Sequence, residues 1–225
     1  MSHITRPGRP ALTVFLPIAI AVLVLVTPTF ALAANSAPLH VRGTIVSSSG
    51  TSVVVSTASG NDTIALGPQT KVLGLVPSSL LNVAPGDFIG TTVAPAANGS
   101  LTSLEVHIFP PALKGTGEGF YPWDTRQNSM MANATVQSVA RQNMMAHATV
   151  QSVGGGATGR TVKLTYNGGT KTVTIPPTVP VVAIRPGSKA LLTVGAHVFV
   201  IASRDPSGLV ANLISVGENG LVPPM

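Results

Sequence analysis

The stretch that decides the fold is residues 41–66, VRGTIVSSSGTSVVVSTASGNDTIAL. Apolar and polar side chains alternate in three short runs, which is typical of half-buried β-strands. Val53 and Val55 share one face of the second run, and Ile64 lies in the third. Gly60, Asn61 and Asp62 lie between the second and third runs and are residue types that favour a turn. These residues predict three short strands joined by tight turns.

The pattern continues outward to residue 109. Residues 77–83 (PSSLLNV) predict one helical turn, and Ala84-Pro85-Gly86-Asp87 predicts a turn into a strand from residue 88 to 93. Asn98-Gly99 is a hairpin signal before a last strand at residues 101–109. Five strands with a helical turn before the fourth is the element order of a small OB-type barrel.

The same order recurs between residues 148 and 216. Residues 172–177 (TVTIPP) match residues 63–68, and residues 191–194 (LLTV) match residues 80–83. The predicted fold class is therefore all-β, with two tandem small five-stranded OB-like β-barrels joined by an aromatic, Gly-rich linker. Because modules this small bury little surface alone, we expect them to pack together or to share the segment between them. The expected boundaries are 40–109 for the first module, 110–146 for the linker with a local duplication, 147–217 for the second module and 218–225 for a tail.

The N-terminal residues read as an export signal. Arg6 and Arg9 precede an apolar run at residues 11–26, and Pro28 and Ala31-Leu32-Ala33 follow it. Positive charge, an apolar centre, a helix breaker and an A-x-A site form the signal-peptide pattern. The sequence thus predicts a signal peptide over residues 1–33 and a periplasmic or secreted protein.

An uncleaved inner-membrane anchor is the alternative, because residues 11–30 are long enough to span a bilayer. Pro17 and Pro28 interrupt that run and favour cleavage. No later segment is long and apolar enough to cross, so no membrane span is expected once the signal is removed.

Composition narrows the function classes. The chain has no cysteine, which excludes thiol catalysis and thiolate metal sites. The net charge of +6 comes from scattered basic residues, and no basic run or set of aromatics on a strand suggests a nucleic-acid partner. No G-x-S-x-G, H-E-x-x-H or S-x-x-K motif is present, so we do not expect an enzyme.

Glu105 and His107 are the first candidate site. Two positions apart on a strand, they project from the face opposite Leu104 and Val106. A carboxylate beside an imidazole can hold a metal or move a proton. The alternative is that both lie on the solvated outer face of a barrel strand.

A local duplication supplies the second candidate site. Residues 130–139 (MMANATVQSV) recur as residues 144–153 (MMAHATVQSV). We expect the second copy to form the first strand of the second module, because it is contiguous with that module, and the first copy to be a loop or an edge strand. Thioethers and imidazole suit copper or zinc handling, whereas the alternative is that the copied methionines fill gaps in the core. The residues are Met130, Met131, Met144, Met145 and His147.

The linker has its own pattern. Gly115-Thr116-Gly117-Glu118-Gly119 lacks the strand before it and the helix after it that a nucleotide loop needs. We expect its glycines to let the backbone approach a barrel closely, and its aromatic side chains to pin the modules together. If exposed, they would form a partner patch. The residues assigned to this packing are Glu118, Phe120, Tyr121, Trp123 and Asp124.

Several motifs together resemble a family of exported alphaproteobacterial envelope proteins with small β-barrel domains of unknown function. They are residues 84–90 (APGDFIG), 104–110 (LEVHIFP), 115–119 (GTGEG) with 122–124 (PWD), and 220–225 (GLVPPM). The resemblance covers nearly all of the chain after the signal and implies export and the barrel fold, with no established activity. Relatives are expected to have His-Arg where this chain has Phe120-Tyr121, so a site that used that histidine is altered here.

The leading hypothesis is therefore an exported, non-enzymatic binding or scaffold module with an envelope protein, peptide or glycan as partner. The alternative hypothesis is an envelope protein that binds or handles copper or zinc.

Overall fold

A computed structural model gives the fold, and it describes residue 3 and residues 37–96, 99–141 and 159–225. The predicted signal peptide lies outside the described residues. The described part is all-β, with thirteen strands and four short 3₁₀ turns. No helix in these ranges is long and apolar enough to cross a membrane.

Five strands form a closed barrel, called the first barrel below. They are β1 (Leu39–Ser48), β2 (Ser52–Thr57), β3 (Gly60–Pro77), β12 (His197–Asp205) and β13 (Gly208–Gly217). They pair in the order β13-β12-β1-β2-β3, and parallel pairing of β13 with β3 closes the circle. The alternating apolar residues of each strand point inward, and Ile45, Val55, Ile64, Val200 and Ile214 have no exposed surface. The closed five-strand barrel expected from the sequence is thus confirmed.

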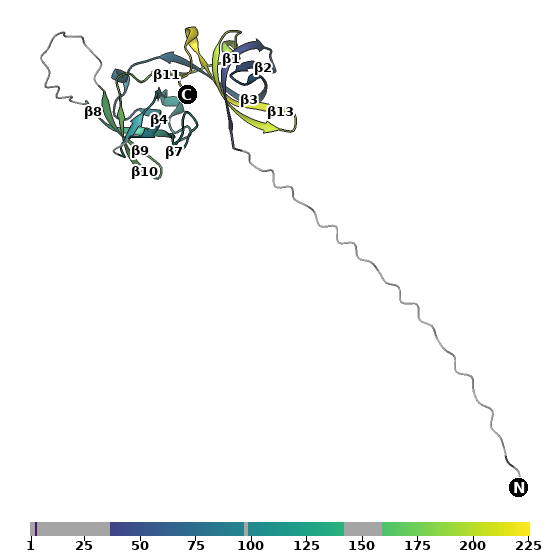
Figure 1. The fold of residues 1–225 in the computed structure, drawn as a ribbon, viewed down its shortest axis with the longest axis horizontal. Coiled ribbons are helices and arrows are strands. Elements are labelled where there is room, and N and C mark those ends of the chain that lie inside the picture. The colour runs from purple at the N-terminus through teal and green to yellow at the C-terminus, as the bar shows by residue number, and fades with distance from the viewer. Residues whose placement is uncertain (1–2, 4–36, 97–98, 142–158) are drawn as a thin grey trace. The chain divides into compact units, whose positions relative to one another are not determined.

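A second set of strands also returns on itself, and we call it the second ring. It contains β4 (Phe88–Pro95), β5 (Leu101–Ser103), β8 (Met130–Arg141), β9 (Arg160–Tyr166) and β10 (Gly169–Ile175). Each strand pairs with the next in the order β4-β5-β10-β9-β8, and β8 pairs back to β4. A separate apolar cluster fills it, including Ile89, Val106, Leu164 and Val173. Figure 1 shows the strands of each group gathered together.

Neither predicted module folds onto itself. The first three strands of the first module, β1–β3, are completed by β12 and β13 from the other end of the chain. Correspondingly, β4 and β5 of the first module complete β8, β9 and β10. The tandem arrangement of two self-contained barrels is therefore not confirmed, because the two repeats exchange their last strands.

The crossover between the repeats is itself a strand pair. The second half of β3 pairs antiparallel with β11 (Val181–Pro186), which pairs in turn with β6 (Val106–Ile108). After each crossover strand comes a short turn with a serine cap. Ser79 caps η1 (Leu80–Asn82), and Ser188 caps η3 (Lys189–Leu191). The repeated order of elements read from the sequence is thus present, although the strands are paired differently.

The remaining elements bridge these parts. They are η2 (Pro111–Leu113), the short strand β7 (Gly119–Pro122), which pairs with β8, and η4 (Glu218–Gly220). A third apolar cluster joins Leu75 of β3 with Val182 and Ile184 of β11, and the tail residues Leu221 and Met225 pack against it.

The duplicated segment also departs from expectation. The first copy forms β8, where it pairs with β4, β7 and β9, so the prediction of a loop or edge strand is wrong. The second copy lies outside the described residues. The two copies are so similar that strand pattern alone does not say which one fills the position.

Candidate functional site

A cavity of about 190 Å³ lies between strands of the first barrel and strands of the second ring. We call it the shared cavity. Its wall is largely apolar and aromatic, with a few polar side chains, which is the usual character of a small-molecule site. From the barrel it takes Phe199, Leu213 and Ser215, and from the second ring and β6 it takes His107, Met131 and Asn133.

Strand register explains why the residues of the second ring face the shared cavity. Gly90 of β4 pairs with His107 on one side and with Asn133 on the other, and Thr92 pairs with Met131. Residues directly opposite each other in antiparallel strands project from the same face. Because Val106, next to His107, and Ile89, next to Gly90, lie in the core of the second ring, this face is the outer one.

Glu105 and His107 form a buried pair at this wall. The side chain of Glu105 has no exposed surface, and His107 is 3% exposed. Glu105 Oε2 lies 3.5 Å from His107 Nε2, and the Thr92 hydroxyl donates to the other carboxyl oxygen, Oε1. Within the described residues, neither Oε2 nor Nε2 has a hydrogen-bond partner. The pair is therefore a close contact between two buried polar atoms whose hydrogen bonds are unmet.

Burial sets the protonation of this pair. Loss of solvation raises the pKa of Glu105 to about 8, although the Thr92 hydrogen bond and the charge of Arg42 lower it. Loss of solvation also lowers the pKa of His107 to about 4. The neutral form of each side chain is therefore the favoured one at pH 7.

The solvated alternative for Glu105 and His107 is wrong. Both do project from the face opposite Val106, as the alternation predicts, but packing against other parts of the fold covers that face. A local sequence pattern shows which face a residue takes and does not show what covers that face.

Two neighbouring residues of the predicted linker, Trp123 and Asp124, contact the first barrel. The Trp123 ring lies 4.3 Å from the His40 ring and 6.0 Å from the Phe199 ring, centroid to centroid. Asp124 accepts hydrogen bonds from both terminal nitrogens of Arg42, at 2.6 and 3.2 Å. Partial burial raises the pKa of Asp124, but its contacts with Arg42 and His40 outweigh that effect and lower it to about 2.

The linker residues just before them contact the second ring. Phe120 stacks on Tyr166 with 6.1 Å between ring centroids, and the Glu118 carboxylate accepts a hydrogen bond from the Asn167 N–H at 2.9 Å. Tyr121 accepts a hydrogen bond from Asn133 at 2.9 Å. The linker residues singled out in the sequence thus contact both strand groups.

The methionine candidates are divided. Met131 lines the shared cavity, whereas Met130 packs against the core of the second ring. Met144, Met145 and His147 lie outside the described residues. In the described part of the chain, no three His, Asp or Glu side chains gather as a metal site would require.

Sequence reasoning missed most of the wall of the shared cavity, including Asn133, Phe199 and Met225. It also missed Gly90, which pairs with His107 and Asn133 behind that wall. Asn133 is the one position where the duplicated segments differ, which was a signal that this residue has a specific role. Gly90 gave a second signal, because glycine inside a strand often marks a close approach. For Phe199 and Met225 the sequence offers no comparable signal.

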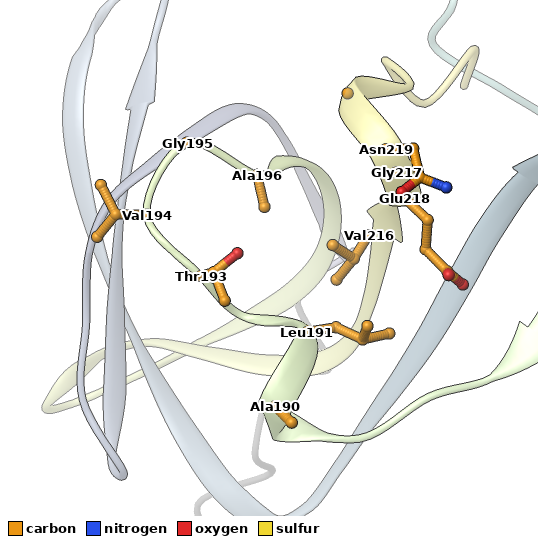
Figure 2. A pocket seen from close by; sticks show the side chains of 11 residues that line it. Ala190, Leu191, Thr193, Val194, Gly195, Ala196, Val216, Gly217, Glu218 and Asn219 are labelled. Carbon is orange, nitrogen blue, oxygen red and sulfur yellow. The ribbon is translucent and has the colours of Figure 1, made fainter.

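Another pocket, of about 390 Å³, lies at one end of the first barrel. Figure 2 shows the loop from Ala190 to Ala196 facing the segment from Val216 to Asn219. Among the described residues that line it, Glu218 is the only charged one and none is aromatic. The shared cavity is the better candidate because it combines aromatic walls with buried polar groups.

No family model, curated protein or solved structure matches the chain. The resemblance to exported barrel proteins therefore stays a prediction. Any functional interpretation must come from the geometry of the shared cavity.

Proposed function

We propose that this protein is a non-enzymatic binding protein of a bacterial envelope and that its ligand occupies the shared cavity. The observation that carries the proposal is a largely apolar cavity with the buried Glu105–His107 pair at its wall. Apolar walls supply affinity and a few fixed polar groups supply specificity. Export rests on the signal pattern of residues 1–33.

Binding is a better account of this cavity than catalysis. The Glu105 carboxyl is fully buried and reaches the cavity only through His107. At neutral pH His107 is uncharged, and its burial holds the ring in the cavity wall as a fixed polar group. Such an arrangement orients a ligand without breaking a bond in it.

The test is a fragment screen on the protein without its signal segment, read by two-dimensional amide NMR. We expect hits that shift the amide signals of Met131, Asn133 and Leu213, which line the cavity from both sides. The Leu213→Phe variant narrows the cavity from the barrel wall and should lose those shifts. A screen whose hits all map elsewhere, or survive Leu213→Phe, contradicts the proposal.

Copper handling is the second candidate, and one observation favours it. His107, Met131 and Met225 line the same cavity. Imidazole with two thioethers is a soft ligand set that suits Cu(I) better than zinc. Titration of Cu(I) against a chromogenic chelator, with the isosteric Met131→Leu variant as the comparison, decides this. Binding weaker than about micromolar, or equal in both proteins, eliminates the copper function.

A further inference from the structure

A single unpaired cation borders the shared cavity. Among the described residues that line the cavity, Lys71 of β3 is the only one with a charged side chain at neutral pH, because the neutral form of His107 is favoured there. The Lys71 side chain is exposed, so its ammonium group remains in contact with water. That group forms no ion pair or hydrogen bond within the described part of the chain. Its charge is therefore available to a ligand.

Strand register shows where this cation lies relative to the apolar wall. One row of paired residues crosses four strands of the first barrel, in the order His40, Ile201, Leu213 and Lys71. The row faces outward, because neighbouring residues such as Val200 and Ile214 point into the barrel core. The last three residues of the row all line the shared cavity. Two interstrand spacings, about 10 Å, separate Ile201 from Lys71.

At the opposite end of the row, charges are paired within the protein. His40 Nδ1 lies 2.9 Å from Asp124 Oδ1, and the same carboxylate accepts hydrogen bonds from Arg42. The buried Glu105 adds no negative charge, because loss of solvation favours its neutral form at pH 7. Among the described groups around the cavity, the unpaired charge therefore lies at the Lys71 end of an apolar floor.

We propose that the shared cavity takes a small amphiphile with one carboxylate, whose apolar body lies over Ile201 and Leu213 and whose carboxylate lies beside the Lys71 ammonium group. The apolar wall supplies affinity, and the cation sets the orientation of the ligand. Because a cavity of about 150 Å³ admits benzene, one of about 190 Å³ takes a body of about six to eight carbon atoms. This inference rests on the proposed ligand-binding function and names the ligand class.

The test uses hexanoate as the probe, with 1-hexanol and hexylamine as controls of the same chain length. At neutral pH the head group of hexanoate is negative, that of 1-hexanol is uncharged and that of hexylamine is positive. Amide NMR titrations follow the signals of Met131 and Leu213, which line the cavity from both sides, and so give the affinity and the location together. We expect hexanoate to bind in the millimolar range or tighter, and hexylamine to bind at least about fivefold more weakly.

Two substitutions at Lys71 test the role of its charge. Lys71→Met keeps the length of the side chain and removes the charge, so hexanoate should bind about threefold to fivefold more weakly, whereas 1-hexanol binding should not change. Lys71→Glu should reverse the order, so that hexylamine binds more tightly than hexanoate. Lys163→Met is the matched control, because Lys163 is an exposed lysine of β9 that does not line the cavity. It should leave all three affinities unchanged.

Two results would overturn the ligand class. One is equal binding of hexanoate and hexylamine to the unaltered protein. The other is a hexanoate affinity that Lys71→Met leaves unchanged or that Lys163→Met lowers as much, because the net charge of the protein would then explain the effect. If hexanoate fails to bind while the fragment screen still finds hits in the cavity, only the ligand class is wrong, whereas failure of both experiments overturns the proposed function as well.

Discussion

Replacing Glu105 by glutamine should change how the stability of the protein depends on pH. In the native state the carboxyl of Glu105 has a pKa of about 8, against 4.5 when it is not perturbed. The pKa of His107 moves the other way, from 6.5 to about 4. Folding stability follows the difference in bound protons between the unfolded and native states. The two shifts therefore predict a profile with a flat part and a declining part.

Between pH 4.5 and 6.5 the profile should be flat. The unfolded chain there carries a charged glutamate and a charged histidine, while the native pair is neutral, so both states bind the same number of protons. Above pH 6.5 the unfolded histidine is also neutral, and only the native Glu105 retains a proton. The free energy of unfolding should then fall by about 1.4 kcal/mol per pH unit, or roughly 2 kcal/mol between pH 6.5 and 8.

The Glu105→Gln variant isolates the contribution of His107. Without the carboxyl, the decline above pH 6.5 should vanish. Stability should instead rise between pH 4.5 and 6.5 by about 1.4 kcal/mol per pH unit, because the unfolded histidine binds a proton that the native one does not. Asp124 and Asp205 do not interfere, since their lowered pKa values affect stability only at more acidic pH.

Urea denaturation at five pH values between 4.5 and 8 measures both profiles. Wild-type stability that is constant or rising from pH 6.5 to 8 would refute the neutral buried pair. A Glu105→Gln profile parallel to that of the wild type would refute the assignment to Glu105.

Three further predictions concern the fold. Gly43→Ala should strongly destabilise the protein, because its Cβ would overlap the Ser56 carbonyl, whereas Gly50→Ala, which meets open space, should be nearly neutral in the same urea titration. Asp124→Asn should cost less than about 1 kcal/mol, since the Asp124 side chain is half exposed, and the loss should shrink at high salt; a larger or salt-independent loss would contradict a surface contact. Deleting residues 130–143 should leave a protein that still unfolds cooperatively in thermal denaturation, because the second copy can enter the same strand position. The free energy of unfolding should fall by about 1–2 kcal/mol, because a histidine then replaces Asn133 and its two hydrogen bonds are lost. Failure of that deletion variant to fold would show that the copies are not interchangeable.

The strands and the order of the repeats could be predicted from the sequence, because alternation and turn-forming residues are local patterns. The exchange of the last strands between the two repeats could not be predicted. Both repeats present similar edges, so β12 can in principle pair with either β1 or β8, and no local pattern distinguishes those partners. The duplicated segment posed the same difficulty, because register is weakly specified when two nearly identical strands compete.

The candidate site was partly visible in the sequence. Glu105 and His107 stood out by their chemistry, and their spacing placed them on one face. Their burial could not be foreseen, because it depends on packing between residues far apart along the chain.

The central claim is that the shared cavity binds a ligand, and native mass spectrometry tests it most directly. The protein and its Leu213→Phe variant are equilibrated with the same small-molecule extract of envelope fractions and then compared. The account predicts a bound small molecule on the wild-type protein that is absent from the variant. A wild-type protein that stays free of added mass, or an identical adduct on both proteins, would contradict it.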